Sequence, residues 1–141
     1  VKREAPTRAE LSKTIIVLFA ACCLGALANS LAVLVFGTTG ITGAMGVSIS
    51  PALTPNWLYP RIVWGGLWGL LFLLPLHKTN IFSKGAILSL GPTVIQLFVI
   101  FPLKAHKGLA GLELGLLTPL LVLFFNWVWG VSAAAAIKLS K

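Results

Sequence analysis

The stretch TIIVLFAACCLGALANSLAVLVF, residues 14–36, decides the fold class. Asn29, Ser30 and a few small side chains are its only interruptions, and as a helix its 23 residues would extend for about 34 Å. That length exceeds the roughly 30 Å of hydrocarbon in a typical bilayer. The stretch is also too long for the apolar region of a secretory signal, and three more apolar stretches follow it. We therefore predict a retained transmembrane helix.

The whole chain shares this apolar character. Of its 141 residues, 57% are hydrophobic and only 10% are charged, and the mean hydropathy is +0.96. Soluble domains are much more polar, with about 25% charged residues. The composition predicts a protein whose main partner is the lipid bilayer.

Apolar stretches at residues 14–36, 60–76, 86–103 and 114–137 predict four transmembrane helices. The expected fold is an all-α integral membrane protein, a four-transmembrane-helix bundle. Residues 1–13 would be a cytoplasmic N-terminal segment, and residues 14–141 the four-helix transmembrane domain. Prolines 60, 92 and 119 are expected in opening turns, where a missing N–H costs least, so no helix needs a break inside the membrane.

The distribution of Lys and Arg predicts the orientation, because cations resist translocation. The two ends of the chain and the loop between the second and third helices carry eight of the eleven cations, and Arg61, Lys104 and Lys107 lie on the other side. We therefore expect a multi-pass protein of the inner (plasma) membrane with both termini in the cytoplasm. Because the cations lie outside the apolar stretches, the net charge of +8 indicates anionic headgroups nearby and no nucleic acid.

The two halves of the chain share short matches in the same order. Leu53-Thr54-Pro55 parallels Leu117-Thr118-Pro119, and Val63-Trp64-Gly65 parallels Val128-Trp129-Gly130. These matches predict two tandem parallel helical-hairpin repeats related by a twofold axis along the membrane normal, with Trp64 and Trp129 at equivalent places.

Three strongly polar side chains lie inside the predicted helices: Asn29, Gln96 and Asn126. Lipid offers them no hydrogen-bond partner, so they are expected to face the interior of the bundle. There they either join helices or line a polar path, and the sequence leaves both roles open.

Glu113 is the only acid beyond the N-terminal segment, and it stands at the outer mouth of the predicted fourth helix. It is expected either to cap that helix, to pair with Lys104 or Lys107, or to attract cations or handle protons at a cavity entrance. Trp57 and Tyr59 stand where the second helix enters the membrane, which is typical of interfacial aromatics.

Groups for acid–base catalysis or metal binding are scarce. There is no Asp, and His77 and His106 are expected on opposite sides of the membrane, so no catalytic residue, metal site or cofactor is predicted. The composition favours a non-catalytic inner-membrane subunit that packs or assembles with other transmembrane helices, in a homo-oligomer or a larger complex. The alternative is a small channel or transporter with a polar path at the seam of the bundle.

The orientation can be tested by cysteine labelling. In a background lacking Cys22 and Cys23, a cysteine at Asn80 or Lys141 should react only with a reagent on the cytoplasmic side, and one at Lys104 only with a reagent outside. Labelling of Asn80 and Lys104 from the same side would contradict the four-helix topology.

Overall fold

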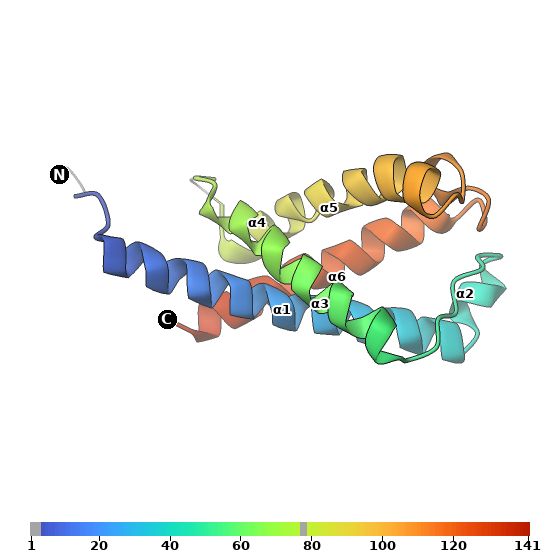
Figure 1. Cartoon of the computed structure of the whole chain (residues 1–141), viewed down its shortest axis with the longest axis horizontal. Coiled ribbons are helices and arrows are strands. Elements are labelled where there is room, and N and C mark those ends of the chain that lie inside the picture. Colours follow the sequence, from blue (N-terminus) through green and yellow to red (C-terminus); the bar gives the residue numbers. More distant parts are fainter. Residues whose placement is uncertain (1–3, 77–78) are drawn as a thin grey trace.

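The computed structural model describes residues 4–76 and 79–141. The regular secondary structure of this part of the chain is helical, and it contains no β-strand. Figure 1 shows the arrangement of the helices along one long axis. In chain order they are α1 (Arg8–Thr38), α2 (Ile41–Ala44), α3 (Pro55–Trp68), the 3-10 helix η1 (Gly69–Leu73), α4 (Ile81–Leu88), α5 (Leu90–Ile95), the π-helix η2 (Gln96–Lys104), the 3-10 helix η3 (Leu109–Gly111) and α6 (Thr118–Leu139).

The molecule has two distinct ends (Figure 1). The start of α1, the end of α6 and the connection from η1 to α4 lie together, on the left of the view. This end carries five of the described cations, Arg8, Lys13, Lys84, Lys138 and Lys141, and we call it the basic end. The other end, which we call the loop end, holds residues 39–54 and 105–117.

Three helices of the described part are long and apolar enough to cross a membrane: Arg8–Thr38, Ile81–Lys104 and Thr118–Leu139. This confirms a multi-pass architecture by length and composition. The predicted second helix is shorter, with 14 residues in α3 and 5 in η1.

Local capping sets helix boundaries that hydropathy did not predict. Thr7 and Glu10 form a capping box, which begins α1 six residues before the predicted start. The Thr54 hydroxyl accepts from the Trp57 N–H, so the second helix begins at Pro55 and not at residue 60. The last helix begins at Thr118, because Gly115 has a φ of +154° and the chain before it turns.

The third long helix runs from Ile81 to Lys104, but its backbone is irregular, which the sequence did not predict. A turn at Ser89 with helical φ and ψ separates α4 from α5, Pro92 is the third residue of α5, and the backbone widens to a π-helix from Gln96 onward. Proline removes one N–H and crowds the preceding turn, which perturbs a helix at that point. Pro60 likewise lies within α3 and not in its opening turn.

Glycines allow the helices to approach closely. α1 packs along α6 and α3, and α6 also packs against α4. A Cβ on Gly25 would stand 2.6 Å from the Trp129 carbonyl oxygen, and one on Gly65 would collide with Ala26. Gly85 and Gly130 face each other with backbone against backbone. Small residues at helix crossings are typical of bundles in lipid, where close van der Waals packing drives association.

Three apolar clusters lie in the interior. The larger cluster occupies the half nearer the basic end, a second joins α1 and α6 to Val47 at the loop end, and a third joins η2 to α6. Cys22 is fully buried in the larger cluster, where its free thiol packs among apolar side chains. At the loop end, segments 39–54 and 105–117 are in contact, since the Ser48 N–H donates to the Leu114 carbonyl at 2.9 Å.

The two halves are not strictly symmetric. α1 packs closely on α6, whereas α3 and α5, which the repeat would pair in the same way, make few contacts with each other. The environments of the two tryptophans differ as well, since Trp64 is 54% exposed and Trp129 is 3% exposed. The duplication itself stays a prediction.

The close crossing of α4 and α6 leads to a stability prediction. Gly130→Ala should lower the free energy of unfolding by about 1–3 kcal/mol, because its Cβ would meet the Gly85 carbonyl. Gly43→Ala is the matched control, since a Cβ there would meet nothing within 4 Å. Thermal unfolding in lipid nanodiscs measures both variants, and equal stability of the two would contradict the described crossing.

Candidate functional site

Arg61 lies inside the bundle, on the second turn of α3. Its Nε donates to the Ser30 hydroxyl at 3.1 Å and its Nη2 to Asn29 Oδ1 at 2.7 Å. The guanidinium also lies over the Trp57 ring, 4.6 Å from the ring centroid. α3 therefore brings a positive charge to the polar face of α1.

A chain of hydrogen bonds runs from Arg61 through the three predicted polar residues. Asn29 Nδ2 donates to the Phe125 carbonyl at 2.6 Å and to Asn126 Oδ1 at 3.4 Å. Asn126 Nδ2 then donates to the Thr93 hydroxyl at 3.1 Å and to Gln96 Oε1 at 3.3 Å. We call Asn29, Arg61, Gln96 and Asn126 the polar cluster. The prediction that the two asparagines and the glutamine face the interior is met by these contacts.

Arg61 determines which group donates and which accepts in each of these hydrogen bonds. A guanidinium has only donors, so Asn29 must present its oxygen to Arg61 and its amide N–H groups to Phe125 and Asn126. The same logic turns the oxygen of Asn126 toward Asn29 and its N–H groups toward Gln96. Each side-chain amide oxygen in the polar cluster therefore accepts a hydrogen bond.

Unused hydrogen-bond donors remain at both ends of this series of hydrogen bonds. Arg61 has five N–H groups, of which Nε–H and one on Nη2 have partners among the described residues. At the other end, Gln96 Nε2 carries two N–H groups and donates to no described residue. The polar cluster thus keeps unpaired N–H donors on Arg61 and Gln96, while each of its amide oxygens already accepts one hydrogen bond, and donors around a positive charge favour an anion.

Counted along the helices, the four members of the polar cluster lie at similar depth. Asn29 is about 14 Å from the end of α1 at the loop end, and Arg61 is about 9 Å from the start of α3. Gln96 and Asn126 are each about 12 Å from the loop ends of η2 and α6. Side chains from α1, α3, η2 and α6 therefore form one polar layer.

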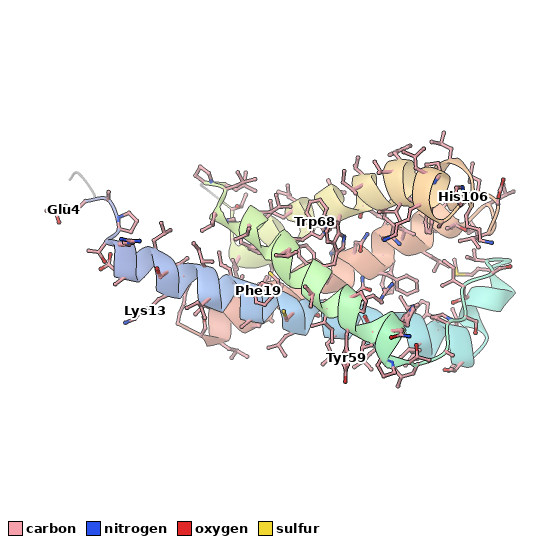
Figure 2. The ribbon with its side chains drawn as sticks, in the orientation of Figure 1. Glu4, Lys13, Phe19, Tyr59, Trp68 and His106 are labelled. Carbon is pink, nitrogen blue, oxygen red and sulfur yellow. The ribbon has the colours of Figure 1, made fainter. Side chains whose placement is uncertain are left out.

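No acid of the described chain neutralises Arg61. Glu10 precedes Asn29 on α1 by about 28 Å of helix, and Figure 2 shows Glu4 at the basic end. Glu113 lies in the turn beyond η3 and lines neither pocket around Arg61. Arg61 is half-buried, and a charge drawn into a bundle without a partner ion is costly, so its presence calls for a function.

Two pockets meet at the polar cluster, and all four of its members line both. The first, of about 360 Å³, reaches toward the loop end and is also lined by residues 48–51. The second, of about 480 Å³, lies between α3 on one side and α5 and η2 on the other. Both volumes fall in the range of small-molecule sites.

Toward the basic end the polar cluster gives way to the larger apolar cluster. Leu18, Cys22 and Phe72 are buried there, and Gly69 is in close contact with Cys22. The polar residues therefore do not form a continuous path from one end to the other in this arrangement.

Glu113 does not cap the last helix, which contradicts one of its predicted roles. α6 begins at Thr118, five residues later, and has no acid in its first turn. The Glu113 side chain is exposed and packs beside Gly108. It lines neither pocket around the polar cluster, so a role for it at a cavity entrance gains no support from the pockets.

Trp57 and Tyr59, both predicted to be interfacial, lie in different environments. Trp57 turns inward, where its ring contacts Arg61, while Tyr59 is 63% exposed and points away from the bundle (Figure 2). The interfacial role of Tyr59 stays a prediction. His106 is exposed at the loop end (Figure 2), and His77 lies outside the described residues. The described part holds no group of three His, Cys, Asp or Glu side chains that could bind a metal ion.

Arg61 is the residue that the sequence reasoning misplaced. It was counted among the cations outside the membrane, because the second helix was predicted to begin only one residue earlier. The Thr54-Pro55 pair carried the missing signal, since a threonine cap followed by proline is typical of a helix start. With the helix beginning at Pro55, Arg61 falls in its second turn and must find partners inside the bundle.

The contacts predict unequal roles for the two amides. Asn126→Leu should lower the free energy of unfolding by about 1–2 kcal/mol, because it removes three interhelical hydrogen bonds worth roughly 0.6 kcal/mol each. Gln96→Leu should cost no more than about 0.6 kcal/mol, since it loses one bond at 3.3 Å. Thermal unfolding in nanodiscs compares the two variants. A greater loss of stability in Gln96→Leu than in Asn126→Leu would contradict the described hydrogen bonds.

Searches with protein-family models, among curated proteins and among solved structures found no match to this chain. Its function must therefore be argued from the polar cluster and the pockets around it.

Proposed function

We propose that this chain is a small non-catalytic membrane transporter that binds an anionic solute at Arg61. The observation that carries the proposal is the donor-rich polar cluster, in which Arg61 and Gln96 keep unused N–H groups. The cluster lines two pockets and has no acid beside it. An anion held there would receive charge-assisted hydrogen bonds and would neutralise the half-buried guanidinium.

The membrane arrangement is part of this proposal. α3 and η1 form a fourth transmembrane element beside the three long helices, helped by the hydrogen bond from Lys84 Nζ to the Phe72 carbonyl at 2.7 Å. The basic end faces the cytoplasm, as the surplus of cations there favours. With Arg61 inside the bundle, the outer count of cations falls from three to two, Lys104 and Lys107, which strengthens the asymmetry.

Transport requires a change of shape, and the third long helix offers a place for it. Its turn at Ser89 and its π-helical turns from Gln96 onward bring irregular helical backbone beside the polar cluster. Such backbone at membrane depth is typical of transporters, where it lines a cavity. The arrangement described here is open toward the loop end and closed at the basic end by packed apolar side chains.

The assembly role remains a second candidate, because the first turns of α1 contact no other helix. Every residue from Arg8 to Val17 is exposed, including Leu11, Ile15 and Ile16. Lipid or a helix of another chain would cover this segment. Such a role would leave the unused donors at Arg61 without a purpose, so we rank it below anion transport.

Tryptophan emission provides a direct test, because the Trp57 ring contacts the guanidinium that an anion would engage. In nanodiscs of neutral phosphatidylcholine, inorganic phosphate should change the emission of the wild-type protein saturably. Arg61→Gln and Gln96→Glu should each weaken this response roughly tenfold or more, which corresponds to about 1.4 kcal/mol. Gln96→Glu is the sharper variant, since it keeps the shape and the acceptor oxygen but adds a negative charge.

Lys107→Gln is the matched control, because it removes a cation at the loop end that lines neither pocket. It should leave the phosphate response unchanged. In proteoliposomes, uptake of labelled phosphate should follow the same order among the variants. An emission change of equal size in the wild-type protein and in Arg61→Gln would contradict the proposal, as would a stronger response to cations than to phosphate.

A further inference from the structure

The larger pocket opens along the side of the bundle and not at its end. We call it the lateral groove. Its first wall is formed by residues 60, 64 and 68 of α3, and its second wall by residues 92, 95 and 100 of α5 and η2. Arg61, Gln96 and the two asparagines form its floor, and Lys104 lies at its rim.

The two walls of the lateral groove make few contacts with each other. α3 packs mainly on α1, and α5 packs mainly on η2 and α6. The walls come together at Trp68, whose ring lies beside Gly91 of α5. In Figure 1 the ribbons of α3 and of the segment from α5 to η2 diverge toward the loop end, with α6 visible between them. α5 and η2 belong to a helix long and apolar enough to cross a membrane, so in a bilayer the walls of the groove would lie at hydrocarbon depth.

The walls and the floor differ in chemistry. The walls are apolar and aromatic, with Trp64, Trp68, Ile95 and Ile100 among the lining residues (Trp68 is labelled in Figure 2). The floor has a positive charge and free N–H donors. No Glu of the described chain lines the groove, whereas the exposed Lys104 adds a second positive charge at the rim.

We infer that the lateral groove binds a membrane amphiphile that has a small anionic head, such as a phosphate monoester, and a hydrocarbon tail. The head binds to Arg61 and Gln96, and the tail lies between the tryptophans of α3 and the isoleucines of α5 and η2. The ligand enters from the bilayer. This inference rests on the proposed anion site and names the class of its ligand.

The dimensions agree with such a ligand. Arg61 lies about 9 Å along α3 from the loop end, a depth that a lipid head drawn slightly inward from the interface can reach. Lys104 at the rim would attract the head before it enters. A free anion could reach Arg61 through the smaller pocket at the loop end, but it would make no use of the apolar walls.

Native mass spectrometry of the protein released from nanodiscs tests this inference. The discs contain phosphatidylcholine with 10% phosphatidic acid, about one anionic lipid in ten, as the probe. The wild-type protein should retain one phosphatidic acid with at least a roughly tenfold preference over phosphatidylcholine, about 1.4 kcal/mol. Arg61→Gln should lose the preference, and Lys107→Gln should keep it.

A second pair of variants tests the groove itself. Ile95→Trp places a large ring between the walls and should abolish retention of phosphatidic acid. Val94→Trp is the matched control, because Val94 is exposed on the neighbouring helix face and does not line the groove. The phosphate-dependent change in tryptophan emission should persist in both variants, since the smaller pocket still leads to Arg61.

The outcomes separate this inference from the proposed function. Equal retention of phosphatidic acid by Ile95→Trp and Val94→Trp would overturn the groove as its site. A phosphate response in emission without any preference for phosphatidic acid would overturn the lipid ligand and leave the anion site standing. Absence of both responses in the wild-type protein would overturn the two proposals together.

Discussion

The guanidinium of Arg61 is the constraint on which the polar interior depends. In the interior of a helix bundle an N–H group gains from each acceptor that it finds, and a guanidinium offers no acceptor in return. Asn29 must therefore turn its oxygen to Arg61, which turns its N–H groups to Phe125 and Asn126. Asn126 then donates to Gln96. One charged side chain on α3 thus sets the orientation of the side-chain amides on α1, α6 and η2. A series of hydrogen bonds, each donated in the same direction, links the four side chains.

This series of hydrogen bonds can form only because the helices approach closely at glycine. Gly65 lies against Ala26, one turn from Arg61 and Asn29, so α3 delivers its arginine directly onto α1. Gly25 lies against the Trp129 carbonyl and Gly130 against Gly85, which draws α6 between α1 and α4. The helices are tightly packed in the half nearer the basic end and spread apart toward the loop end. The polar cluster lies where the close packing ends, and both pockets begin there.

The sequence was sufficient for the coarse fold and for part of the site. Long apolar stretches predicted the membrane helices, and the cost of a bare amide in lipid predicted that Asn29, Gln96 and Asn126 face inward. Hydropathy could not predict Arg61, because a cation near the edge of an apolar stretch reads as a loop residue until the cap at Thr54 sets the helix start. It could not predict the turn at Ser89 or the π-helix from Gln96 either, since neither changes the apolar character of the stretch. The loss of symmetry between the halves depends on tertiary packing, which repeated tripeptides do not report.

The balance of donors and acceptors is what separates a binding site from a structural polar contact. A cluster that only joined helices would satisfy its polar groups within itself, because an unpaired buried donor costs about 1–3 kcal/mol. Here each amide oxygen already accepts one hydrogen bond, and the unpaired N–H groups at Arg61 and Gln96 are donors. A cation would be repelled by the guanidinium, whereas an anion would pair with the unused donors and balance the charge. The proposed selectivity for negative charge therefore follows from the direction of a single series of hydrogen bonds, and that direction is imposed by the one side chain in it that can only donate.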